Sequence, residues 1–230
     1  MAGDTLVIIY ENYDKVALWY KSSAETYLID VGFKDPSFFL WSPKNDTFIL
    51  GTKKGNLVIY DILNDKVDTI LGKHSKEITC GTWTDDDMLV LGSNDKTISF
   101  SSRDGQTIQS FSLMSNPKTI LHTYHNDRCF ISVNLDSDVW FYDASNPLDG
   151  VQKESKLITF PPEVGRILCH FWQPDGGSII ISTTCGRFIC QPNPLLENMD
   201  DDYHILEYSV QLGRICKCCV QLQSFVVVGK

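Results

Sequence analysis

The chain has 230 residues, of which 43% are hydrophobic and 21% charged, the balance of a globular protein with a sizeable core. Its formal net charge is −9. Phosphate backbones would therefore repel it, and we expect no direct binding of nucleic acid. The early apolar run Leu6–Tyr10 is too short for a signal-peptide core, and no stretch approaches the roughly 18 apolar residues of a spanning helix. We expect neither export nor membrane insertion.

The eight cysteines fit the same interpretation. Several of them fall inside strand-like runs, where a free cysteine behaves as a small hydrophobic residue. Since no export signal is seen, the reducing cytoplasm is the expected compartment and a disulfide framework is not expected.

A repeat of constant length organises the chain. Positions 41 residues apart are occupied by Trp19, Tyr60, Ser101 and Tyr142. The residues just before them are apolar and keep the same spacing, as in the set Leu18, Ile59, Phe100 and Phe141 and the set Val16, Leu57, Ile98 and Val139. Apolar residues that alternate with mixed positions indicate a strand with one buried face. A repeat of this length with an aromatic residue near a strand end is typical of the four-stranded blade of a β-propeller.

The predicted strands can be followed in chain order. Thr5–Trp19 is expected to supply the second and third strands of a blade whose innermost strand is absent. The first complete blade is predicted from Phe38–Trp41, Thr47–Thr52 and Asn56–Tyr60. Its segments Trp41-Ser42-Pro43, Leu50-Gly51-Thr52 and Gly55–Asp61 are close to the WD-repeat consensus, with Tyr60-Asp61 in the place of the Trp-Asp pair.

The later blades repeat the pattern. The second is predicted from Ile78–Trp83, Met88–Gly92 and Thr97–Phe100, and the third from about Lys118 to Phe160. The fourth is predicted from Ile167–Trp172, Ser178–Thr183 and Gly186–Cys190. Gly213–Lys230 is expected to form the first two strands of a further blade. We therefore predict an all-β, incomplete WD-repeat β-propeller, with about four full blades and two partial ones, as a single domain over residues 1–230.

One stretch goes beyond the general repeat. Residues 38–83, from Phe-Phe-Leu-Trp-Ser through Gly-Thr-Lys-Lys-Gly-Asn-Leu-Val-Ile-Tyr to Leu-Gly-Lys-His-Ser-Lys-Glu-Ile-Thr-Cys-Gly-Thr-Trp, resemble the first propeller of the large WD-repeat subunits of intraflagellar transport complex A. Weaker similarity covers residues 1–190. Members of that family carry an earlier first blade, a second propeller and a helical-repeat region, so the resemblance implies that this chain is a fragment whose propeller stays open.

The resemblance also implies a function. It predicts a non-catalytic scaffold or adaptor that supports retrograde ciliary transport and ciliary assembly, without a cofactor. Its partners would be other complex A subunits and cargo adaptors, and its location the cilium, the ciliary base and the cytoplasm. The alternative is a WD-repeat adaptor of another assembly, such as a vesicle coat or a ubiquitin ligase.

A basic patch is the candidate partner-binding site. In a propeller, the turns between the second and third strands and the loops between blades emerge on the same face. This places five lysines together on two adjacent blades, namely Lys53, Lys54, Lys73, Lys76 and Lys96. The opposite face should carry Asp46, Asp61, Asp65 and Asp85–Asp87. The patch could dock an acidic partner segment or contact anionic lipid headgroups weakly; alternatively, its lysines serve only solubility.

Two patterns suggest chemistry, and each has a structural alternative. Ser93, Asp95 and His74 have the residue types of a hydrolase triad, whereas in WD-repeat blades such a His and Asp bond each other and tie blade edges together. The aromatic residue that usually completes that network is replaced by Ser101, so we expect an incomplete bond set.

The second pattern is a set of cysteines and histidines that could bind a metal ion. Cys216 and Cys219 form a Cys-x-x-Cys, which could be one half of a zinc site. The other half could come from Cys185 with Cys190, or from His170 and His204. The spacing does not suit a compact zinc site, and a strand would point neighbouring cysteines to opposite faces. The innermost strands otherwise offer mainly His170, Cys80 and Cys169, which is too little for an enzyme, so we expect neither a metal nor catalysis.

Overall fold

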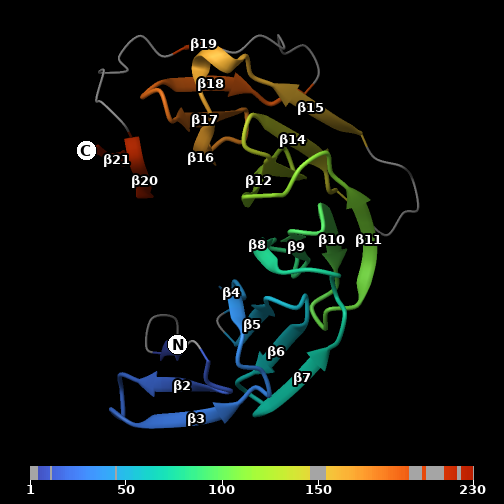
Figure 1. Ribbon diagram of the computed structural model, residues 1–230, viewed down its shortest axis with the longest axis vertical. Helices are drawn as coiled ribbons and strands as arrows, with labels where there is room; N and C mark the ends of the chain where they lie inside the picture. Colours follow the sequence, from blue (N-terminus) through green and yellow to red (C-terminus); the bar gives the residue numbers. More distant parts are fainter. Residues whose placement is uncertain are drawn as a thin grey trace. The chain divides into compact units, whose positions relative to one another are not determined.

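The computed structural model describes residues 5–10, 12–44, 46–145, 154–196, 204–205, 215–221 and 224–229. In the last three of these ranges it describes the backbone and, of the side chains, only that of His204. Apart from one short 3-10 turn, η1 (Pro162–Val164), the elements within these ranges are β-strands (Figure 1). No helix in the described part of the chain is long and apolar enough to cross a membrane. The chain forms two compact units, Met1–Asn116 and Pro117–Lys230.

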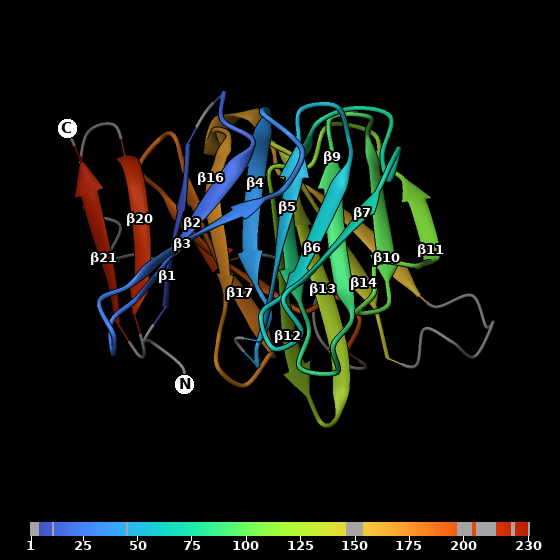
Figure 2. The same ribbon diagram turned by 90° about the horizontal axis from the view of Figure 1, so that it is seen from below.

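The first unit contains three antiparallel sheets, in each of which strands that follow one another in the chain lie side by side (Figure 2). The strands of these sheets are β1 (Thr5–Ile9), β2 (Lys15–Tyr20) and β3 (Thr26–Asp30), then β4 (Pro36–Trp41), β5 (Thr47–Thr52), β6 (Leu57–Asp61) and β7 (Lys66–Ile70), and then β8 (Ile78–Trp83), β9 (Leu89–Ser93), β10 (Thr97–Ser101) and β11 (Thr107–Ser112).

The second unit follows the same plan. Its strands are β12 (Thr119–His125), β13 (Arg128–Asn134), β14 (Asp138–Asp143) and β15 (Ser155–Thr159), then β16 (Ile167–Trp172), β17 (Ser178–Thr183), β18 (Phe188–Pro192) and β19 (His204–Ile205), and finally the pair β20 (Ile215–Gln221) and β21 (Ser224–Gly229).

These sheets are the blades of an incomplete WD-repeat β-propeller, as the sequence predicts. Four of the described sheets have four strands, whereas the first has three and the last has two. The predicted pair in Thr5–Trp19 is β1 and β2, and β3 adds an outer strand to them. The predicted pair near the carboxyl end is β20 and β21, which pair antiparallel.

The middle strands of the blades carry the core. All six residues of β5 and all five of β9 are buried, because both faces of these strands are covered. Between the second and third sheets, the buried residues Ile49, Leu57 and Leu91 belong to one apolar cluster. Outer strands such as β7 are mostly exposed. Because the blades are packed face to face, the turns that connect their strands are held in fixed positions, and these turns form the candidate interaction surface.

Candidate interaction surface

Three connections meet at one end of the first unit. They are the turn 53–55 between β5 and β6, the loop 71–77 between β7 and β8, and the turn 94–96 between β9 and β10. The His74 amide donates to the Gly55 carbonyl at 2.9 Å, and the Asn94 amide donates to the Glu77 carbonyl at 2.9 Å. The backbone approach at Gly55 is so close that a Cβ there would lie 2.1 Å from the His74 carbonyl oxygen, and its φ of +80° also favours glycine. The three connections therefore form one continuous surface, which we call the turn surface.

Four of the five predicted lysines are exposed on the turn surface, namely Lys53, Lys54, Lys76 and Lys96. Whether they bind a partner stays a prediction.

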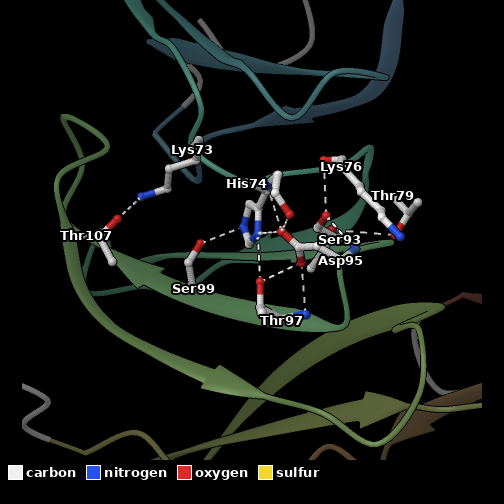
Figure 3. Close-up of polar contacts among 11 residues, drawn as sticks. Lys73, His74, Lys76, Thr79, Ser93, Asp95, Thr97, Ser99 and Thr107 are labelled. Carbon is white, nitrogen blue, oxygen red and sulfur yellow. Dashed lines mark hydrogen bonds and ion pairs between the residues drawn. The ribbon is translucent and has the colours of Figure 1, made fainter.

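Lys73 differs from the other four lysines, because it is half-buried and does not lie at an exposed tip. Its ammonium donates to Ser101 Oγ at 2.6 Å, to the Gly105 carbonyl at 2.9 Å and to Thr107 Oγ1 at 2.6 Å, so it is turned inward, over β10 and β11 (Figure 3). Burial lowers its pKa to about 8. The reason is local. Position 101 carries a small serine where sister blades carry Tyr60 and Tyr142, and the serine hydroxyl accepts a bond from the lysine.

His74 is the centre of a buried polar network behind the turn surface. Its Nδ1 lies 3.2 Å from Asp95 Oδ2 and 3.0 Å from Thr97 Oγ1, and its Nε2 lies 2.9 Å from Ser99 Oγ (Figure 3). A neutral ring satisfies these contacts when Nδ1–H donates toward Asp95 and Nε2 accepts from the Ser99 hydroxyl. Burial lowers the pKa of His74, although Asp95 opposes this. Both ring nitrogens of His74 thus have partners without the aromatic residue that usually completes such a network.

Asp95 joins the network to the backbone. Its carboxylate accepts from the Ser75 amide at 2.9 Å and from the Thr97 amide at 3.0 Å and hydroxyl at 2.6 Å. Burial alone would raise the pKa of Asp95, but these bonds and the nearby His74 outweigh it and hold the pKa below its ordinary value. The network fastens the loop 71–77 to the turn 94–96, as the structural interpretation predicts.

The triad interpretation finds no support in this geometry. The Ser93 hydroxyl donates to the Lys76 carbonyl at 3.1 Å and accepts from the Asp95 amide at 3.1 Å. The hydroxyl that faces His74 Nε2 belongs to Ser99 instead. A serine nucleophile needs the histidine base within hydrogen-bonding reach, and Ser93 is engaged elsewhere.

Sequence reasoning missed a cation at the opposite end of the strands. Arg103, in the turn after β10, makes an ion pair with Asp46 at 2.6 Å and donates to Thr47 Oγ1 at 2.9 Å. It also lies 3.6 Å from a carboxylate oxygen of Asp87, which pairs with Lys44 as well. Asp46 and Asp87 of the predicted acidic face are therefore partly neutralised. The turn composition gives no signal for this, because Arg103 is 57 positions from Asp46.

The titratable residues of the innermost strands, His170, Cys80 and Cys169, are buried or bonded to neighbouring side chains. His170 is buried, with Nδ1 3.2 Å from Thr119 Oγ1 and Nε2 2.8 Å from Ser132 Oγ, and burial lowers its pKa to about 4. Burial raises the pKa of the Cys80 thiol to about 12, and Cys169 Sγ lies 3.0 Å from Ser182 Oγ.

The candidate zinc ligands do not form a metal-binding cluster among the residues that the structure describes. There, no group of three or more His, Cys, Asp or Glu residues could hold a metal ion. Cys216 and Cys219 lie in β20, whose side chains are outside the described residues.

Comparison with known proteins connects this architecture to one family. Residues 1–230 match the family model described as WDR19 first beta-propeller. WD repeat-containing protein 19 from Homo sapiens is 31% identical over 97% of this chain, and the protein of the same name from Mus musculus is 33% identical over 81%. WD repeat-containing protein dyf-2 from Caenorhabditis elegans is 26% identical over 77% of this chain. The aligned part is 18%, 14% and 13% of these relatives, so the chain spans less than a fifth of their length.

Proposed function

Because this chain belongs to the family of WDR19 first β-propeller domains, we propose that it is a non-catalytic scaffold or adaptor in intraflagellar transport complex A. In this role it supports retrograde ciliary transport and ciliary assembly through contacts with other complex A subunits and cargo adaptors. It works at the cilium, at the ciliary base and in the cytoplasm. The family match over residues 1–230 is the observation that carries the proposal.

The turn surface supports a role in binding. Buried bonds to His74 and Asp95 hold it in place, so little conformational entropy is lost when a partner docks. It presents the exposed lysines Lys54, Lys76 and Lys96 on a chain whose net charge is −9. A local basic surface on an acidic protein attracts an acidic segment of a partner protein.

The experiment is affinity purification of the full-length protein from ciliated cells, followed by mass spectrometry. We expect complex A subunits in the eluate. Recovery of vesicle-coat or ubiquitin-ligase subunits in their place would contradict the proposal and support the alternative adaptor function.

A charge-reversal variant tests the turn surface. In Lys54→Glu/Lys76→Glu/Lys96→Glu, we expect binding to a recovered acidic partner to weaken about tenfold or more at low salt, where screening is least. The matched control Lys21→Glu/Lys66→Glu/Lys118→Glu changes the net charge equally at exposed positions elsewhere. Equal affinities for the two variants would refute the role of the turn surface. Loss of binding to phosphatidylserine vesicles alone would assign the lysines to lipid contact instead.

A further inference from the structure

A groove of about 510 Å³ lies between the first two sheets, at the opposite end of β6 from the turn 53–55. One wall comes from β2, β3 and the turn that joins them, and the other comes from the end of β6 and the residues after it. Its size is in the range of sites that hold a small molecule or a few residues of a peptide. The groove is thus separate from the turn surface, and the proposed function does not use it.

Tyrosine rings line the groove. Tyr20 and Tyr27 meet edge to face, with ring centroids 5.7 Å apart, and Tyr60, whose side chain is buried, adds to the lining from the second sheet. Tyr27 is 51% exposed and its neighbour Leu28 is 58% exposed, although both are apolar in most of their surface. Exposed rings at a groove offer both contact area and the negative π-face that attracts a cation.

The charged groups of the groove are both acidic. Among the described residues that line it, Glu25 and Asp65 are the ionisable carboxyls and no lysine or arginine is present. The Tyr27 hydroxyl donates to Glu25 Oε2 at 2.7 Å, and the Tyr60 hydroxyl donates to Asp65 Oδ1 at 2.7 Å. Each tyrosine thereby orients a carboxylate, whose other oxygen can accept a bond from a ligand.

We propose that this groove binds an arginine-bearing extended segment of a partner protein. A guanidinium group can lie flat on a tyrosine ring while it donates to the carboxylate oxygen that the tyrosine hydroxyl leaves open, and an ammonium group cannot stack in this way. The apolar surface of Leu28 and Ile62 takes the flanking side chains. An anionic ligand such as a nucleotide is disfavoured, because it would face two carboxylates.

The proposal is tested by fluorescence anisotropy with the full chain and a labelled peptide, Gly-Leu-Arg-Gly-Arg-Leu-Gly, at physiological salt. The matched peptide carries citrulline in place of both arginines, which keeps the shape and removes the charge. We expect the arginine peptide to bind at least tenfold more tightly than the citrulline peptide. Equal binding of the two, or no binding of the arginine peptide at millimolar concentration, would overturn the proposal.

Variants locate the contact. Glu25→Gln/Asp65→Asn keeps an acceptor for each tyrosine hydroxyl, and we expect it to weaken binding of the arginine peptide at least tenfold. The control Glu163→Gln/Asp127→Asn removes the same charge at exposed positions elsewhere and should leave binding unchanged. If both variants weaken binding equally, the peptide responds only to net charge and the groove is not its site.

Discussion

Lys73 shows how one residue type can serve opposite purposes on one surface. Lys54, Lys76 and Lys96 are exposed at neighbouring positions, whereas Lys73 is bound by acceptors from β10 and from the segment that follows it. A buried ammonium loses hydration, and its hydrogen bonds to neutral oxygens compensate for this only in part, so its pKa falls. Lys73 is therefore half-buried against the blade, and fewer lysines are exposed on the turn surface than the sequence predicts.

His170 provides a prediction at the residue scale. Burial lowers its pKa to about 4 in the folded chain, against about 6.5 for an exposed histidine. The unfolded chain thus binds this proton more tightly than the folded chain. The contribution of His170 to the free energy of unfolding is therefore fully present above about pH 6.5. It falls by roughly 3 kcal/mol as the pH drops toward 4.

The measurement is urea denaturation of the chain and of His170→Gln between pH 7 and pH 4.5. We expect the variant, whose amide can still bond Ser132, to be less stable at pH 7 but to lose less stability on acidification. His74 has a lowered pKa as well, so a residual slope in the same direction should persist. Parallel curves for the two proteins would show that His170 does not titrate in this way.

At the scale of the elements, the loop 71–77 and the turn 94–96 behave as one piece. Asp95 connects them, since it accepts from Ser75 on the loop and from Thr97 at the start of β10. Asp95→Ala leaves the buried ring of His74 without a carboxylate and the Ser75 amide without this acceptor. We expect a loss of stability on the order of 1–3 kcal/mol.

Chemical denaturation of Asp95→Ala, with Glu163→Ala as an exposed control in the second unit, measures this loss. An unchanged midpoint would mean that the network stabilises nothing. If the midpoint stayed the same and a hydrolytic activity disappeared, the triad interpretation of Ser93, His74 and Asp95 would replace the structural one.

The strand pattern predicted most of the elements, for a reason that lies in packing. Middle strands such as β5 and β9 are buried on both faces, so they appear as short apolar runs between turn residues. Outer strands such as β7 and β11 are largely exposed, and their composition is close to that of a loop. The inner strands of each blade could accordingly be predicted from the sequence better than the outermost strands.

At the scale of the whole molecule, the sequence predicts that residues 1–230 form one domain, and the chain shows two compact units. The two possibilities differ in cooperativity. If the prediction holds, both units should unfold in one transition. Cys80 in the first unit and Cys129 in the second are buried cysteines that can report on each unit separately.

Thiol labelling in increasing urea, followed by mass spectrometry, gives an unfolding midpoint for each cysteine. We expect the midpoints for Cys80 and Cys129 to coincide, since a single cooperative domain exposes both at once. Two separate midpoints would divide the chain into two domains at about residue 116 and overturn the single-domain prediction.

The sequence by itself determined the blade repeat, the class of fold and the family, because these depend on apolar residues at regular spacing and on short turn motifs, which are local properties of the chain. Only the tertiary structure decided which polar residues meet. Three features join residues from different loops or sheets: the inward turn of Lys73 onto Ser101, the bridge from Arg103 to Asp46, and the groove that both Tyr27 and Tyr60 line. Such contacts follow from the stacking of neighbouring blades, and linear spacing does not encode them, because the distance along the chain does not fix the distance in space.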